Sequence, residues 1–250
     1  SSDPDYQMPP PETNLTTSQY EIALLEKWID QGAEWKKHWS FISPQKVQIP
    51  DNETNVWSNM NDVDHFILQK AEEKNQKISR EATPERLLRR VYMDLTGLPP
   101  SVESIDQFIS NPSFSAYESV VDHLLTTEAH AERLTMEWMD VARYADSHGL
   151  HADGWRNMSP WRDWVIQSFH ENVTYKEFIT KQLAGDMLSN ASKDDIIATA
   201  FNRNHPMTAE GGAVDEEWRL NYVFDRTETM STAMLGLTVG CAKCHDHKYD

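Results

Sequence analysis

Residues 83–100 read TPERLLRRVYMDLTGLPP and carry the start, the apolar face and the end of one amphipathic helix. Thr83 followed by Pro84 is typical of a helix N-terminus, because the first helical residues have unpaired amides and proline has no amide hydrogen to leave unpaired. Apolar side chains then recur at the spacing of one helical face, at Leu87, Leu88, Val91, Tyr92 and Leu95. Gly97 and the Pro99-Pro100 pair predict the end of this helix.

The same spacing of apolar residues recurs along nearly the whole chain. Capping boxes, in which serine or threonine is followed three residues later by glutamate, predict helix starts at Ser18, Ser115 and Thr174. Other helices are expected at about 60–75, from Ser101, at about 128–145, from Ser159-Pro160, from Ser192, and from Asp215 to about Leu237. No segment has the pattern of a strand or of a strand–helix–strand unit, so we predict an all-α, multi-helix fold.

An irregular stretch divides the chain. Residues 40–58 contain two prolines and a run of polar residues, a composition typical of a linker. We therefore expect an N-terminal segment, 1–39, and a helical domain, 59–250. The polar, proline-containing stretch at 1–11 resembles the interior of a longer protein.

Composition limits the classes of partner. The chain has 250 residues, 39% of them hydrophobic, which is enough to bury a sizeable core. Its net charge of −17 argues against a nucleic-acid partner, because phosphates would be repelled. No run of 18 apolar residues is present, so we expect no transmembrane segment in this chain.

The strongest motif for chemistry is Cys241-Ala242-Lys243-Cys244-His245, which holds both cysteines of the chain. The C-x-x-C-H spacing is that of covalent haem c attachment, in which two thiols bind the haem and the histidine ligates the iron. The alternatives are a redox dithiol, half of a zinc site, or two unrelated cysteines. Because haem is attached covalently outside the cytoplasm, the motif implies an exported protein of the periplasm or cell surface.

A second cluster has the pattern D-x-H-x-x-H-x-D, formed by Asp146, His148, His151 and Asp153. Two imidazoles and two carboxylates are plausible ligands for a divalent metal ion. Two alternatives remain open: distal ligation of a haem iron by His148 or His151, and a hydrogen-bonded loop that binds nothing.

A third stretch, Asn202–Met207, is predicted as a polar loop between helices. Its His205 and Met207 are further candidates for the distal position of a haem iron, and the alternative is a structural loop. Arginine binds carboxylates bidentately, which suggests pairing with haem propionates, although surface salt bridges would explain the same residues. The candidate arginines are Arg143, Arg162, Arg203 and Arg226.

The N-terminal segment resembles the C-terminal end of a class I cytochrome c domain. The resemblance is carried by Met8-Pro9-Pro10 and by a helix with Trp28-Ile29 and Gly32-Ala33. It implies that residues 1–39 are the remnant of such a domain. It also implies that Met8 would be the distal ligand of a haem whose own C-x-x-C-H lies upstream of Ser1.

The remaining segments resemble planctomycete-type cytochrome c proteins, in which a cytochrome-like domain precedes helical domains of poorly defined function. The matching segments are His38-Trp39-Ser40-Phe41, Asp94–Pro100, Ala142–Gly149, Trp161–Ile166, Gln182–Asp186, Glu210-Gly211-Gly212 and Cys241–Asp250. Such proteins are encoded beside sulfatases and carbohydrate-degradation genes. The resemblance implies a C-terminally truncated helical domain in a multidomain, exported bacterial protein.

Together these features predict a haem c electron-transfer module that acts as an electron carrier rather than a catalyst. The resemblance also implies a link to polysaccharide degradation. The expected partners are other haem domains of the same polypeptide and a periplasmic or surface redox protein. Alternatives are a haem-dependent oxidoreductase acting on carbohydrate, a non-redox helical binding or scaffold domain, and a metallohydrolase that uses the loop at 146–153.

Overall fold

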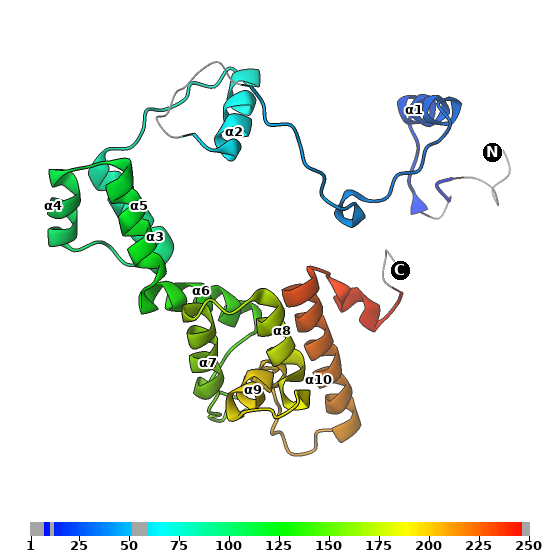
Figure 1. The fold of residues 1–250 in the computed structure, drawn as a ribbon. Coiled ribbons are helices and arrows are strands. Elements are labelled where there is room, and N and C mark those ends of the chain that lie inside the picture. The colour runs from blue at the N-terminus through cyan, green and yellow to red at the C-terminus, as the bar shows by residue number, and fades with distance from the viewer. Residues whose placement is uncertain (1–7, 11–12, 52–59, 247–250) are drawn as a thin grey trace. The chain divides into compact units, whose positions relative to one another are not determined.

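The computed structural model of the chain describes residues 8–10, 13–51 and 60–246. Within these residues every regular element is a helix, which confirms the all-α prediction (Figure 1). The chain divides into two compact units, Ser1–Arg80 and Glu81–Asp250, so residues 59–80 belong with the N-terminal unit. Residues 52–58 of the predicted linker lie outside the described residues. None of the described helices is long and apolar enough to cross a membrane.

The described residues of the first unit form two helices, α1 (Gln19–Asp30) and α2 (Asp62–Glu73), and include a short 3-10 turn, η3 (Trp39–Phe41). The capping box of α1 forms as predicted, with the Ser18 and Glu21 side chains bonding to each other's backbone amide. No residue of α1 is buried in this unit. The side chains of its predicted apolar face are all exposed: Ile22, Leu25, Trp28 and Ile29.

The second unit begins with three packed helices, α3 (Pro84–Thr96), α4 (Val102–Ser110) and α5 (Phe114–Leu125). In α3 the predicted bounds are confirmed, and Gly97 ends it with the left-handed φ of 71° that glycine adopts without strain. Both α4 and α5 pack against α3 (Figure 1). The apolar core between them is formed by Leu88, Val91, Phe108 and Leu124.

The predicted capping box at Ser115 is wrong. The N-cap of α5 is Ser113, whose side chain accepts a hydrogen bond from the Ala116 amide. Both serines are suitable caps, but capping from Ser113 makes Phe114 the first helical residue. Ser115 then lies inside the first turn, and its carbonyl accepts a hydrogen bond from the Ser119 hydroxyl.

The rest of the second unit forms a larger helical group around one aromatic core. Its helices are α6 (Glu128–Val141), α7 (Ser159–His170), α8 (Tyr175–Ala184), α9 (Lys193–Ala198) and α10 (Asp215–Met230), with 3-10 turns η4 (Gly185–Met187) and η5 (Thr199–Arg203). Helices α6 and α7 pack along each other, and α8 packs against α9 and η5 (Figure 1). The buried core residues are Ala142, Trp161, Val165, Phe178 and Phe201.

Two helix ends determine where the candidate residues lie. Helix α6 stops at Val141 rather than at 145, because Arg143 adopts a left-handed φ of 58° that ends the helix and starts a loop. Helix α10 continues through a π-helical turn, η6 (Ser231–Leu235), close to the predicted end at Leu237. A final 3-10 turn, η7 (Val239–Lys243), then carries the chain into the C-x-x-C-H motif.

Candidate functional site

The C-x-x-C-H motif forms a single helical turn at the C-terminal end of the described chain. The Cys241 carbonyl accepts hydrogen bonds from the amides of Cys244 (3.2 Å) and His245 (3.4 Å). Cys241 and Cys244 are three residues apart across this 3-10 turn, so they lie on one side of it, and His245 follows directly at its end. Both cysteines are exposed and unpaired.

The imidazole of His245 is held in a defined tautomer. Its Nδ1 lies 2.8 Å from the Asp246 carbonyl oxygen. A carbonyl can only accept a hydrogen bond, so Nδ1 carries the proton and donates it. Nε2 is then left with its lone pair free, as it is in histidines that ligate metals.

The motif turn docks on one face of α10. The Lys243 ammonium lies 5.1 Å from the centroid of the Phe224 ring and 3.2 Å from the side-chain oxygen of Asn221. Gly240 lies so close to Glu228 that a Cβ there would come within 2.7 Å of its carboxylate. Asn221, Phe224 and Glu228 are three and four residues apart, so they form one stripe along the helix.

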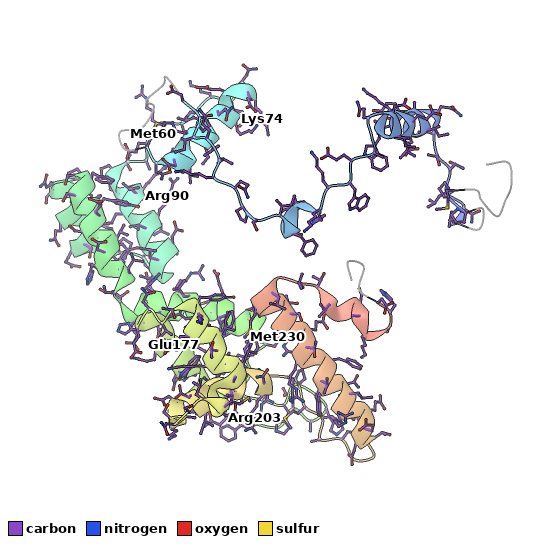
Figure 2. The ribbon with its side chains drawn as sticks, turned by 45° about the vertical axis from the view of Figure 1, so that its right-hand side comes forward. Met60, Lys74, Arg90, Glu177, Arg203 and Met230 are labelled. Atoms are coloured by element: carbon purple, nitrogen blue, oxygen red, sulfur yellow. The ribbon has the colours of Figure 1, made fainter. Side chains whose placement is uncertain are left out.

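The two candidate loops, predicted separately, pair with each other. The Met207 amide donates a hydrogen bond of 2.7 Å to the His148 carbonyl. Isolated bridges join Gly149 to Met207 and Ser147 to Trp155. In Figure 2, the label Arg203 marks the end of η5, within the second loop region, and the label Met230 marks the end of α10. The structure thus brings His148, His205 and Met207 into one region.

The carboxylates of the first loop hold its backbone in place. Asp146 accepts hydrogen bonds from the Tyr144 hydroxyl (2.7 Å) and the Met158 amide (2.8 Å). Burial acts to raise the pKa of Asp146, but these hydrogen bonds and the positive charge of Arg162 outweigh it, so this pKa lies below its usual value. Burial and the bond to Asp146 raise the pKa of Tyr144 to about 12.

Asp153 has a similar role at the tip of the same loop. Its carboxylate accepts a hydrogen bond of 2.7 Å from the Gly149 amide. Hydrogen bonds from the Ser147 side chain and from Gly149 lower the pKa of Asp153. His151 and Asp153 both have left-handed backbones, with φ of 55° and 45°. The four predicted metal ligands therefore include two carboxylates that already bond within the loop.

The described part of the chain contains no preformed cluster of side chains for the predicted divalent metal ion. There, no group of three or more histidine, cysteine, aspartate or glutamate side chains is placed to hold one ion. The involvement of Asp146 and Asp153 in loop hydrogen bonds accounts for this arrangement.

His205 is buried beside α10. Its ring stacks on Tyr222, with centroids 4.7 Å apart and planes inclined by 8°. The Thr208 amide donates to the Tyr222 hydroxyl at 2.9 Å, which fixes the same loop to the same residue. Burial lowers the pKa of His205. In the described chain the buried Nδ1 atoms of His148 and His205 have no hydrogen-bond partner.

Arg156, which the sequence did not single out, clamps the two loops together. Its Nη1 donates to the carbonyls of Arg203 (3.0 Å) and His205 (3.1 Å), and its own amide donates to the Asp146 carbonyl. Burial lowers the pKa of Arg156, and the charge of Arg203 adds to this effect.

Replacing Arg156 by methionine is expected to lower the free energy of unfolding by about 2 kcal/mol, because two carbonyls lose a charged donor. The matched control is Arg162→Met, since Arg162 forms an ion pair with its exposed neighbour Asp163 and acts on Asp146 through its charge alone, so the change should cost less than about 1 kcal/mol. Urea denaturation followed by circular dichroism measures both. Equal losses in the two variants would contradict the clamp.

Three of the four arginines predicted for haem propionates form bonds to protein groups in the described structure. Arg143 forms an ion pair with Asp225 of α10. Arg162 pairs with Asp163, and Arg226 donates from Nε to the Tyr222 carbonyl. These bonds correspond to the salt-bridge alternative for Arg143 and Arg162.

Met8 lies in the first unit, with 80% of its side chain exposed. Residues 1–7 and 11–12 of the predicted cytochrome remnant lie outside the described residues. The role of Met8 as a distal ligand stays a prediction.

Comparison with known proteins gives one match. Residues 62–250 match the model of the family PSCyt2, described as a protein of unknown function (DUF1549). No curated protein and no solved structure matches the chain.

Proposed function

The chain belongs to the PSCyt2 family, and because the function of that family is unknown, we propose one from the residues of this chain: a haem c electron-transfer module. Cys241 and Cys244 would bind the haem covalently, and His245 would be the proximal ligand of its iron. The haem would supply one-electron redox chemistry.

The observation that carries the proposal is the state of the motif turn. Both thiols are exposed and unpaired, and His245 follows Cys244 directly at the end of the same turn. The hydrogen bond from His245 Nδ1 to the Asp246 carbonyl leaves Nε2 free to ligate iron. The donor set and its tautomer therefore fit the group that the C-x-x-C-H spacing suggests.

The surroundings of the motif support the same assignment. Leu235 and Leu237, just before the motif turn, are 60% and 37% exposed. Exposed leucines there would cover part of an apolar ring system that the cysteines hold nearby. The contacts of Lys243 with Phe224 and Asn221 hold the turn against α10, so its donors keep a fixed direction.

The proposed setting is outside the cytoplasm, in the periplasm or on the cell surface. The redox partners would be other haem domains of the same polypeptide and an exported redox protein. A link to polysaccharide degradation rests on the resemblance described above.

The test is to express the chain together with a cytochrome c maturation system and to measure its pyridine haemochrome spectrum after acid–acetone extraction. Covalently bound haem c at about one per chain is the expected result. Extraction of all the haem, or an apoprotein, would refute the proposal.

A further inference from the structure

A cavity of about 820 Å³ lies in the second unit, away from the residues of the motif turn and the paired loops. It is formed by the end of α5, one face of α6, the end of α7 and the start of α8. Its volume is within the range of about 300–1,000 Å³ that is typical of small-molecule sites.

The lining of this cavity is aromatic and uncharged. Its apolar lining residues include Leu134 and Trp138 of α6, Phe169 of α7 and Phe178 of α8. The Trp138 and Phe178 rings meet edge to face at 5.1 Å, and the Phe169 ring lies 5.3 Å from that of Phe178. None of the twelve lining residues is aspartate, glutamate, lysine or arginine, although 25% of the chain is charged. A cationic ligand would find no carboxylate there, and an anionic ligand would find no lysine or arginine.

Among the polar groups of the lining, His130 has a defined hydrogen-bonding role. His130 Nδ1 lies 2.8 Å from the Leu95 carbonyl oxygen, so this nitrogen carries the proton and donates it. In the neutral imidazole Nε2 is then an acceptor, and a ligand that bonds to it must bring a donor. Trp138 Nε1 already donates to Gln182 and the Ser168 hydroxyl to Trp164, so neither is available.

From this lining we infer that the cavity binds an uncharged aromatic molecule that carries a hydroxyl group. Its ring would lie against Trp138, Phe169 and Phe178, where aromatic pairs are favourable. Its hydroxyl would donate to His130 Nε2. The inference does not depend on haem, because none of its residues belongs to the proposed haem site.

The test compares two fluorescent probes, 2-naphthol and 2-methoxynaphthalene, titrated with the full chain at pH 8, where imidazole side chains are generally neutral. The two probes share one ring system, but only 2-naphthol has a hydroxyl donor. Saturable binding of both is expected, with 2-naphthol about fivefold tighter because of one hydrogen bond. Absence of saturable binding would overturn the inference.

Two variants locate the probe. Leu134→Glu places a charge in the cavity and should weaken binding at least about tenfold. The matched control is Leu183→Glu, because Leu183 is 39% exposed, as Leu134 is, but does not line the cavity. Equal effects of the two variants would overturn the inference. So would a wild-type dimer that excludes the probe and that Leu134→Glu dissociates, because a second copy would then cover the cavity.

The His130→Asn variant tests the hydroxyl group. An asparagine amide can reach the position of Nδ1 and keep the bond to the Leu95 carbonyl, but it has no group at the position of Nε2. The preference for 2-naphthol should disappear while 2-methoxynaphthalene binds as before. A preference that persists in this variant would contradict the role of His130.

Discussion

Replacing both Cys241 and Cys244 by serine should abolish covalent haem attachment and leave the helical fold unchanged. Covalent haem would drop from about one per chain to background, because a hydroxyl cannot form the thioether bond. Both cysteines are exposed and unpaired, so the free energy of unfolding should change by less than about 0.5 kcal/mol. Pyridine haemochrome absorbance measures the covalent haem content. Urea denaturation of the apoprotein measures the free energy of unfolding.

The matched control for this experiment is Ala242→Ser, at a spacer position of the same turn. It introduces the same hydroxyl group but keeps both thiols, so haem content should equal that of the wild type. A double serine variant that retains haem after extraction would show that attachment does not use this motif.

The fold could largely be predicted because its signals are local. In α3 the start, the apolar face and the end depend on residues within one stretch, Thr83–Pro100, and all three are confirmed. Errors arose where two local signals competed. Ser113 and Ser115 are both suitable caps, and the local pattern does not distinguish between them. The backbone of Arg143 ends α6 early, in a conformation that its own sequence does not favour.

The candidate residues could be predicted as motifs but not as a site. The C-x-x-C-H turn is local, and so is the hydrogen-bond pattern that forms it. The pairing of the two loops depends on Arg156, whose partners Arg203 and His205 are 47 and 49 residues away. An arginine in a loop has no periodicity that signals such a contact. The only feature of the sequence that pointed toward a contact between the two loops was the number of polar residues in each.

Helix α10 contacts both the motif turn and the paired loops, which were predicted from the sequence as separate features. Asn221 and Phe224 contact the motif turn, whereas Tyr222 and Asp225 contact His205 and Arg143. Successive residues of an α-helix are about 100° apart, so these are adjacent faces of one helix. The same helix therefore carries contacts of both the motif turn and the paired loops.

Replacing Gly185 by alanine should cause the largest loss of stability of any change considered, about 3 kcal/mol or more. A Cβ at Gly185 would lie 2.0 Å from the Asp195 carbonyl oxygen and 2.9 Å from its carbon. These are backbone atoms in the first turn of α9, so no side-chain rotation relieves the clash. The turn is also fixed, because the Asp195 side chain accepts from Ser192 and pairs with Lys181.

The measurement is urea denaturation of Gly185→Ala, with Gly211→Ala as the matched control. A Cβ at Gly211 meets nothing within 4 Å, so alanine there should be neutral or stabilise by up to about 1 kcal/mol, because it restricts the unfolded chain. The difference between the two variants isolates the contact of α9 with the end of α8. If Gly185→Ala unfolds at the same urea concentration as Gly211→Ala, then α9 is free to move, and the close packing of this corner does not hold the domain together.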